Sequence, residues 1–238
     1  MKRYDEALPY ALKALEQNNK LEDRSTIKET LSWSLPYDTP GNYVYMRGVI
    51  RVAPCMETLS PETCQLFEAG DYVINYDKAG GWSSIDGEMY AGISNSKVYM
   101  GWSTSANEYG INADRMFYTA AECYIRTGEI RKGLELVDQV RAKRVENYES
   151  FVALYDQQAL SEEEAMALLQ KAKWIECIAT YENFFDCKRW NSEEKYKHVI
   201  TRNLGEYGTY SIGPDSPLWV LPFPANATRY NPSLTQNY

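Results

Sequence analysis

Five aromatic side chains in one glycine-rich part of the sequence could bind a sugar: Trp33, Tyr37, Trp82, Tyr90 and Trp102. They have few long charged neighbours, and this stretch holds nine of the fourteen glycines of the chain. Flat aromatic faces stack on sugar rings, while nearby Asn and Asp side chains can bond the hydroxyls. We therefore predict these five residues as ligand contacts. The alternative is that each ring packs beneath its own loop.

Carboxylates near Trp82 are the candidates for acid–base chemistry. Asp77, Asp86 and Glu88 lie in the same glycine-rich stretch, and glycoside hydrolysis needs two carboxyl groups at a fixed separation. Sequence spacing does not set that separation. The single histidine, His198, lies in the run KYKHVITR, which favours a surface or strand position and a structural role. We predict no catalytic residue and no enzymatic activity.

The cysteines give no sign of a metal site or a disulfide framework. They are odd in number and contain no C-x-x-C pair, at Cys55, Cys64, Cys123, Cys177 and Cys187. Buried free thiols are the expected state. With one histidine and these spacings, no common zinc motif is present. We predict neither a metal nor a cofactor.

Charge and hydropathy exclude two further classes of function. The net charge of −8 would repel a phosphate backbone, so nucleic acid is not an expected partner. No stretch approaches the roughly 18 consecutive apolar residues of a membrane-spanning helix, and the first residues show no signal peptide. The sequence has 20 Tyr and 6 Trp but only 6 Phe. This composition suits partly solvated surfaces, because Tyr and Trp join an apolar ring to a hydrogen-bonding group.

Helical patterns flank the glycine-rich stretch, residues 33–110. Residues 4–18 place apolar side chains on one side of a helix: Ala7, Leu8, Ala11, Ala14 and Leu15. We expect this helix to begin near Asp5 with Pro9 in its first turn, where a missing N–H costs nothing. Within the stretch, Ser60-Pro61-Glu62 predicts the start of a short helix.

A tight helical hairpin is predicted after Asn112, with a first helix ending at Gly128 and a second from about 130 to 145. The second helix aligns without gaps on residues 4–18, so that Gly133 falls on Ala7 and Val137 on Ala11. This recurrence predicts helix–turn–helix units of tetratricopeptide type. The first copy has no preceding helix in this chain. We therefore expect that the folding unit starts upstream of Met1, or that another chain supplies that helix.

A long helix and a β-prone tail complete the chain. Ser161-Glu162-Glu163-Glu164 is a capping box, and apolar residues at helical spacing predict a helix towards Phe185 or beyond. Residues 208–224 alternate short β-prone runs with a Pro-Asp turn, and an extended end follows. The prolines of this tail, Pro222, Pro224 and Pro232, are interpreted as a clamp that lays it along the body.

Three motifs stand in order along the chain: RMFYTAAECYIRTGEIRKGLELVDQVRAKR (115–144), FFDCKRW (184–190) and a Pro/Asn-rich ending. They resemble the SusD/RagB family of outer-membrane nutrient-binding proteins: the first resembles the helical hairpin of that family, and the second its F-F-D-L-K-R-W signature. GTYSIGPDSPLWVLPFPANATRYNPSLTQNY (208–238) resembles its ending, and SPETCQLFEAGDYVINYD (60–77) a weaker family segment. The chain is therefore identified as similar to the C-terminal portion of such a protein.

The resemblance implies a mainly α fold: tetratricopeptide-like helix pairs with a loop-rich irregular region, a short C-terminal β-hairpin and an extended tail. One unit would span 1–238. Its parts would be the end of a repeat (1–32), the irregular region (33–110), a helical repeat with the long helix (111–190) and the β/extended tail (191–238).

The resemblance also implies a function and partners. The function would be non-catalytic capture of a nutrient oligosaccharide and its delivery to a TonB-dependent transporter. The protein would sit at the cell surface of the outer membrane, held by a lipid anchor not present in this chain, together with the missing N-terminal half of the family unit. Two alternatives remain: a peptide ligand, or a helical-repeat adaptor that binds a protein partner.

One motif departs from the family, and another is interpreted as structural. AKWIECIATYEN (172–183) keeps mainly Glu176 from the family run E-R-R-x-E-L-x-F-E-G, and we expect Glu176 to meet Arg141 or Arg144. Asp186 lies beside Arg189 and Trp190 in FFDCKRW. It is interpreted as part of an ion pair and aromatic plug that closes a helix onto the core.

Overall fold

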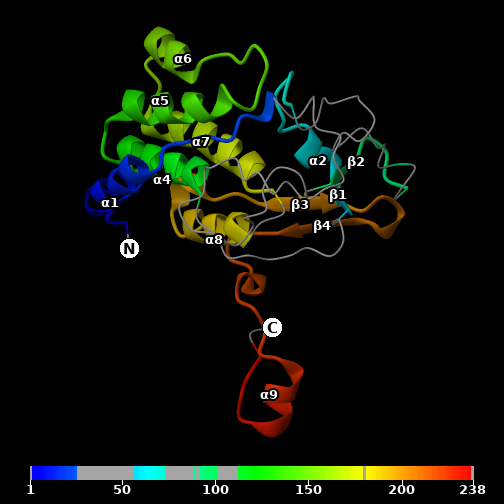
Figure 1. Ribbon diagram of the computed structural model, residues 1–238. Helices are drawn as coiled ribbons and strands as arrows, with labels where there is room; N and C mark the ends of the chain where they lie inside the picture. The colour runs from blue at the N-terminus through cyan, green and yellow to red at the C-terminus, as the bar shows by residue number, and fades with distance from the viewer. Residues whose placement is uncertain are drawn as a thin grey trace.

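The computed structural model describes residues 2–25, 56–72, 88, 92–100, 112–178 and 181–236, and it is mainly helical (Figure 1). The helices are α1 (Tyr4–Gln17), α2 (Pro61–Cys64), α4 (Ala113–Arg126), α5 (Ile130–Arg141), α6 (Phe151–Gln158), α7 (Glu162–Glu176), α8 (Tyr181–Trp190) and α9 (Ala225–Tyr230). The strands are β1 (Met56–Leu59), β2 (Lys97–Met100), β3 (Ile200–Asn203) and β4 (Thr209–Ile212), with 3-10 turns η2 (Glu194–Tyr196), η3 (Gly205–Tyr207) and η4 (Pro217–Trp219). The predicted mainly α fold with a short C-terminal hairpin is confirmed.

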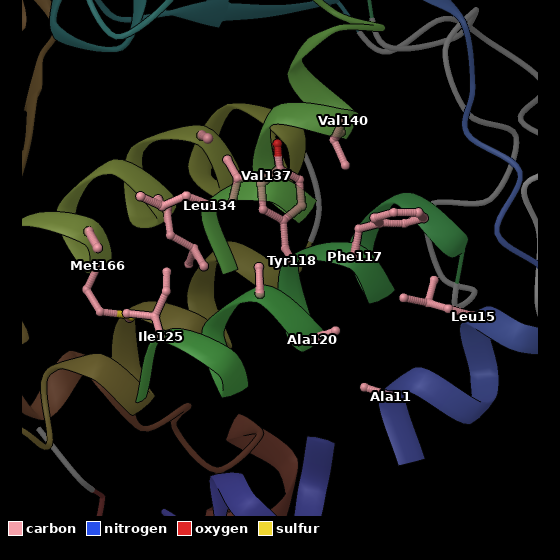
Figure 2. Packing of buried hydrophobic residues seen from close by; sticks show 14 of the residues in the cluster. Ala11, Leu15, Phe117, Tyr118, Ala120, Ile125, Leu134, Val137, Val140 and Met166 are labelled. Atoms are coloured by element: carbon pink, nitrogen blue, oxygen red, sulfur yellow. The ribbon is translucent and has the colours of Figure 1, made fainter. Parts of the chain in front are cut away.

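Four helices build the core of the scaffold. Helix α4 packs against α1 and against α5, and α7 packs on both α4 and α5. Figure 2 shows the apolar side chains that meet there, among them Leu15 of α1, Tyr118 of α4, Val137 of α5 and Met166 of α7. The pairwise stacking of α1, α4 and α5 is the arrangement that the sequence repeat predicts.

The α4–α5 hairpin forms as predicted because its caps and one glycine fit the geometry. The Asn112 side chain accepts from the Arg115 N–H at 2.9 Å and caps α4, and Gly128 follows the helix with φ +89°. A Cβ at Gly133 would lie 2.5 Å from Ile125 Cγ1 and 2.7 Å from the Ala121 carbonyl oxygen. The glycine therefore lets α5 approach α4 closely.

Helix α1 differs from the sequence prediction in two ways. It begins at Tyr4, with the Ala7 N–H donating to the Arg3 carbonyl, so Pro9 lies in the second turn rather than the first. Pro9 is exposed, where solvent can satisfy the carbonyl that loses its helical partner. Ala7 is also exposed, whereas Ala11 is buried, because α4 covers only one face of α1.

The predicted long helix is interrupted. The capping box at Ser161 and Glu164 is confirmed, but α7 ends at Glu176 and α8 is a separate helix. Lys173 Nζ lies 2.7 Å from Asp186 Oδ2, whereas 13 residues of straight helix would hold these residues about 20 Å apart. The chain must therefore turn back between α7 and α8. The Asn183 amide donates to the Trp174 carbonyl at 2.8 Å and satisfies one free group at the end of α7.

In the part of the chain that the structure describes, two small antiparallel sheets accompany the helices. In the irregular region β1 pairs with β2, and α2 begins at Pro61 after the Ser60 cap, as predicted. In the tail, β3 pairs with β4, with Ile200 opposite Ile212 and Asn203 opposite Thr209. The first β-prone run forms β4, and its partner β3 lies before residue 208 and not in the later part of the tail. The second run, near Leu218, forms η4 instead of a strand.

The prediction that the tail lies along the body is wrong for the C-terminal arm, residues 220–236. Figure 1 shows it standing away from the rest of the molecule, with α9 in place of a fully extended end. The Phe223 N–H donates to Gln236 Oε1 at 3.0 Å, and Gln236 Nε2 donates to the Phe223 carbonyl at 3.0 Å. These contacts lie within the arm, because the Gln236 side chain satisfies both backbone groups of Phe223.

Candidate functional site

The five predicted ligand contacts lie outside the described residues: Trp33, Tyr37, Trp82, Tyr90 and Trp102. Asp77 and Asp86 lie outside them too, and Glu88 is exposed. The structure does describe where the two segments that carry these aromatics, 26–55 and 73–111, join the scaffold. Buried polar and charged groups at these junctions hold the ends of the two segments to the helices.

A buried charge cluster centres on Arg144, just after α5. Arg144 Nε donates to Glu176 Oε2 at 2.8 Å, and Nη2 donates to Asp114 Oδ1 at 2.8 Å. The Glu176 side chain is only 5% exposed and the Asp114 side chain is fully buried. The predicted contact between Glu176 and Arg144 is therefore confirmed. We call Glu22, Arg24, Glu68, Asp114, Arg141, Arg144 and Glu176 the Arg144 cluster.

The segment that begins at residue 26 leaves the scaffold from this cluster. The Glu22 N–H donates to Asp114 Oδ1 at 3.1 Å, and the Glu22 carbonyl accepts from Arg144. The Arg24 N–H donates to the Lys143 carbonyl at 3.0 Å, and its guanidinium donates to Glu176 at 3.1 Å. Residues 22–24 are thus held to α4, α7 and the end of α5 immediately before the first aromatic segment.

The second aromatic segment begins after Tyr72, again at the cluster. Arg141 donates to both carboxylate oxygens of Glu68, at 2.8 and 2.5 Å. The Tyr72 N–H donates to the Arg144 carbonyl at 2.9 Å. Gly70 has φ +87°, and a Cβ there would lie 2.7 Å from the Glu146 carbonyl oxygen, so only glycine fits this close approach.

The same segment ends at the start of α4, where Asp114 belongs to the cluster and Arg115 pairs with Glu182 at 2.9 Å. A cavity of about 20 Å³ lies against the cluster, lined also by Tyr118 and Ile175. Three junctions of the aromatic segments therefore converge on one set of buried ion pairs. The arrangement fixes the ends of those segments relative to one another.

Burial and neighbouring charges shift the pKa values of two carboxyl groups in the Arg144 cluster. Burial raises the pKa of Glu22 to about 7, although Arg24 and Arg144 oppose the shift. Burial also disfavours the charged form of Glu176, but Arg144 and Arg24 outweigh it and lower the pKa to about 2. Glu22 thus takes up a proton near neutral pH.

A second buried network closes α8 onto the core. Asp186 pairs with Lys173 at 2.7 Å and with Arg189 at 2.8 Å. Arg189 donates to both oxygens of Glu122, which also accepts from Trp190 Nε1 at 3.2 Å. Trp190 is buried. This geometry matches the interpretation of FFDCKRW as an ion pair and aromatic plug.

The described cysteines and the histidine lie on or near the packed helices. Cys64, Cys123, Cys177 and Cys187 are all free, and all but Cys64 are buried. Burial raises the pKa of Cys187 to about 12 and that of Cys123 to about 11, so both thiols stay protonated. His198 precedes β3, with Nε2 3.2 Å from Cys187 Sγ and its ring against Trp174.

Among the described residues, no three His, Cys, Asp or Glu side chains are grouped so that they could hold a metal ion. Within those same ranges, every helix is too short or too polar to cross a membrane.

Comparison with known proteins identifies the class. A model of the SusD family matches residues 74–238, and the chain belongs to this family. Its fold is similar to that of a SusD-like protein from Bacteroides fragilis, with a TM-score of 0.58 at 13% identity. The match covers 99% of this chain and 61% of the other, so the chain spans less than two thirds of that relative. No curated protein matches.

Proposed function

We propose that this chain captures a nutrient oligosaccharide, without chemical change, for a TonB-dependent transporter at the bacterial outer surface. The observation that carries the proposal is the SusD family match over residues 74–238. The Arg144 cluster supports it, because a binding surface made from two separate segments requires their ends to be held in a fixed relation.

Titration calorimetry with a panel of oligosaccharides tests the ligand class. We expect binding to at least one glycan, with a loss of about tenfold or more on Trp82→Ala or Trp102→Ala, because stacking aromatics carry much of such a contact. Tyr230→Ala is the matched control, since Tyr230 is 82% exposed on α9. Binding to oligopeptides alone would replace the glycan by a peptide. Binding to neither would favour the protein adaptor and overturn the proposal.

We propose further that the chain catalyses no reaction. The protonated buried thiols of Cys123 and Cys187 support this, because a thiol nucleophile must be deprotonated. His198 supports it too, since its ring is packed against Trp174 and is not set beside a serine or a deprotonated thiol among the described residues. Turnover of a bound glycan by the purified chain, detected by chromatography of the products, would contradict this.

The working assembly is proposed to include the N-terminal half of the family unit, with its lipid anchor, and the transporter. The 61% coverage of the Bacteroides fragilis chain supports this, and so does α1. Gly133 packs on α4 within the hairpin, whereas its counterpart Ala7 is exposed, beside a Tyr10 that is 78% exposed. A preceding helix could cover this face, as α4 covers α5.

Two measurements test this assembly. Affinity purification from the native bacterium should recover the chain together with two components: a large outer-membrane receptor and the N-terminal half of the family unit. Protease treatment of intact cells should digest it from the outside. Recovery from the periplasm without either component would contradict the assembly.

A further inference from the structure

The β3–β4 hairpin presents aromatic surface that the fold does not use. Tyr210 on β4 is 61% exposed, and Tyr207 in the turn before it is 69% exposed. The hairpin is held by other groups, namely the cross-strand pair of Ile200 with Ile212 and the hydrogen bond between the Thr201 and Ser211 hydroxyls at 2.9 Å. Tyr210 is therefore available for contact with something outside the described scaffold.

Tyr210 has a cationic neighbour on the same face of the hairpin. Arg202 of β3 is its direct cross-strand partner, so the two side chains project from the same side. Arg202 is exposed, and no acid within the described ranges pairs with it. By contrast, Lys197 at the base of the hairpin pairs with Glu194 at 3.0 Å and with Asp215 at 3.6 Å.

The hairpin turn lies against the irregular region. A Cβ at Gly205 would lie 3.3 Å from the Gly92 carbonyl oxygen and 3.5 Å from Ile93 Cγ1. Helix α2 also packs against β3, and Figure 1 shows the hairpin on the side of the molecule that carries α2. Residues 92–93 stand in the sequence between Tyr90 and Trp102, two of the predicted ligand contacts.

A flat phenol ring beside a free guanidinium is chemistry suited to a sugar. The ring face packs on the C–H face of a pyranose, and the guanidinium supplies several N–H donors in a fixed plane for hydroxyl oxygens. A tyrosine and an arginine also suit a protein interface, so the choice of a sugar here follows from the proposed capture of an oligosaccharide.

We propose that Tyr210 and Arg202 form an oligosaccharide contact on the C-terminal hairpin, with Tyr210 stacking on one sugar ring and Arg202 donating to its hydroxyls. This inference rests on the proposed function and extends the binding surface from the irregular region onto β3 and β4. It assigns a ligand role to the tail, which the family motifs had marked only as scaffold.

Calorimetry of the purified chain with the glycan that it binds best, chosen from the panel, tests the proposal. We expect Tyr210→Ala to weaken binding roughly tenfold, Arg202→Ala to weaken it about threefold to tenfold, and Tyr210→Phe to keep the affinity within about threefold. Arg229→Ala and Tyr230→Ala, an exposed pair of the same types on α9, should leave it unchanged.

The outcomes separate the two proposals. If the wild type binds a glycan and Tyr210→Ala binds it equally well, the hairpin contact is wrong while the proposed function stands. If the α9 pair has the same effect as the hairpin pair, the loss is not specific to the hairpin, and the contact is again wrong. If the wild type binds no glycan, both proposals fail. Circular dichroism verifies that each variant keeps its helical content.

Discussion

The guanidinium of Arg144 and the carboxylate of Glu176 form a buried pair, 2.8 Å apart, that joins the end of α5 to the end of α7. Both partners also hold residues 22–24, through the Glu22 carbonyl and the Arg24 guanidinium. Removing either partner therefore affects the helical scaffold and the segment that leaves it at the same point.

Arg144→Ala should destabilise the protein by about 3–5 kcal/mol, because it leaves the carboxylates of Glu176 and Asp114 buried without their main cation. Urea unfolding followed by circular dichroism measures the change. Arg131→Ala is the control, since Arg131 and Asp156 form an exposed pair at 3.1 Å that solvent screens, so its loss should change the stability little. Equal effects of the two substitutions would show that the Arg144 cluster does not hold the fold.

Glu22 should make stability fall as pH rises through neutrality. Its pKa in the folded state is about 7, above the ordinary glutamate value of 4.5, so between these values the folded state holds a proton that the unfolded state has lost. The stabilisation is fully present below the unfolded pKa and is lost as pH rises through the folded one. Between about pH 5.5 and about pH 8 the loss should be about 2 kcal/mol.

Glu22→Gln should flatten this dependence, because an amide does not titrate. The midpoints of urea unfolding at about pH 5.5 and about pH 8 measure this pH dependence. Glu16→Gln, at an exposed position on α1, is the control. A variant that loses as much stability as the wild type over this range would assign the pH dependence to another group.

The sequence predicts the helices well because their signals are local. Asn112, Gly128 and the Ser161 capping box act on backbone groups within four residues of themselves, and each lies where expected. The break between α7 and α8 was missed because its cause is a distant packing demand. Asp186 must turn back to reach Lys173, and the apolar spacing alone continues through the break.

The Arg144 cluster is the part of the site that sequence reasoning recovers least. The family run predicts Arg141 or Arg144 as the partner of Glu176, and the structure shows Arg144, whereas no sequence pattern predicts the contacts of Glu22 and Asp114. The contact between Glu22 and Asp114 joins residues 92 positions apart, and no periodicity in the sequence indicates such a pairing. The arm was misplaced for a related reason: Gln236 satisfies Phe223 directly, a contact that proline content does not reveal.

Gly133→Ala should destabilise the α4–α5 hairpin by about 1–3 kcal/mol, although alanine favours a helix by about 1 kcal/mol over glycine. The added Cβ would meet Ile125 Cγ1 at 2.5 Å and the Ala121 carbonyl oxygen at 2.7 Å, so α5 would have to move away. Thermal unfolding measures the change. Ala7→Gly at the aligned, exposed position of α1 should show only the propensity effect. A stabilised Gly133→Ala protein would mean that the helices are not in close contact there.

Asp186→Ala should cost about 3–5 kcal/mol, because Lys173 then loses its 2.7 Å partner while its side chain remains only 7% exposed. The double variant Lys173→Met with Asp186→Leu should recover most of that loss, since two apolar side chains can fill the space without a desolvated charge. Urea unfolding of the single and double variants measures both effects. Unchanged glycan affinity in the double variant would assign Asp186 a purely structural role, whereas lost affinity in a fully folded double variant would place the FFDCKRW motif in the ligand site.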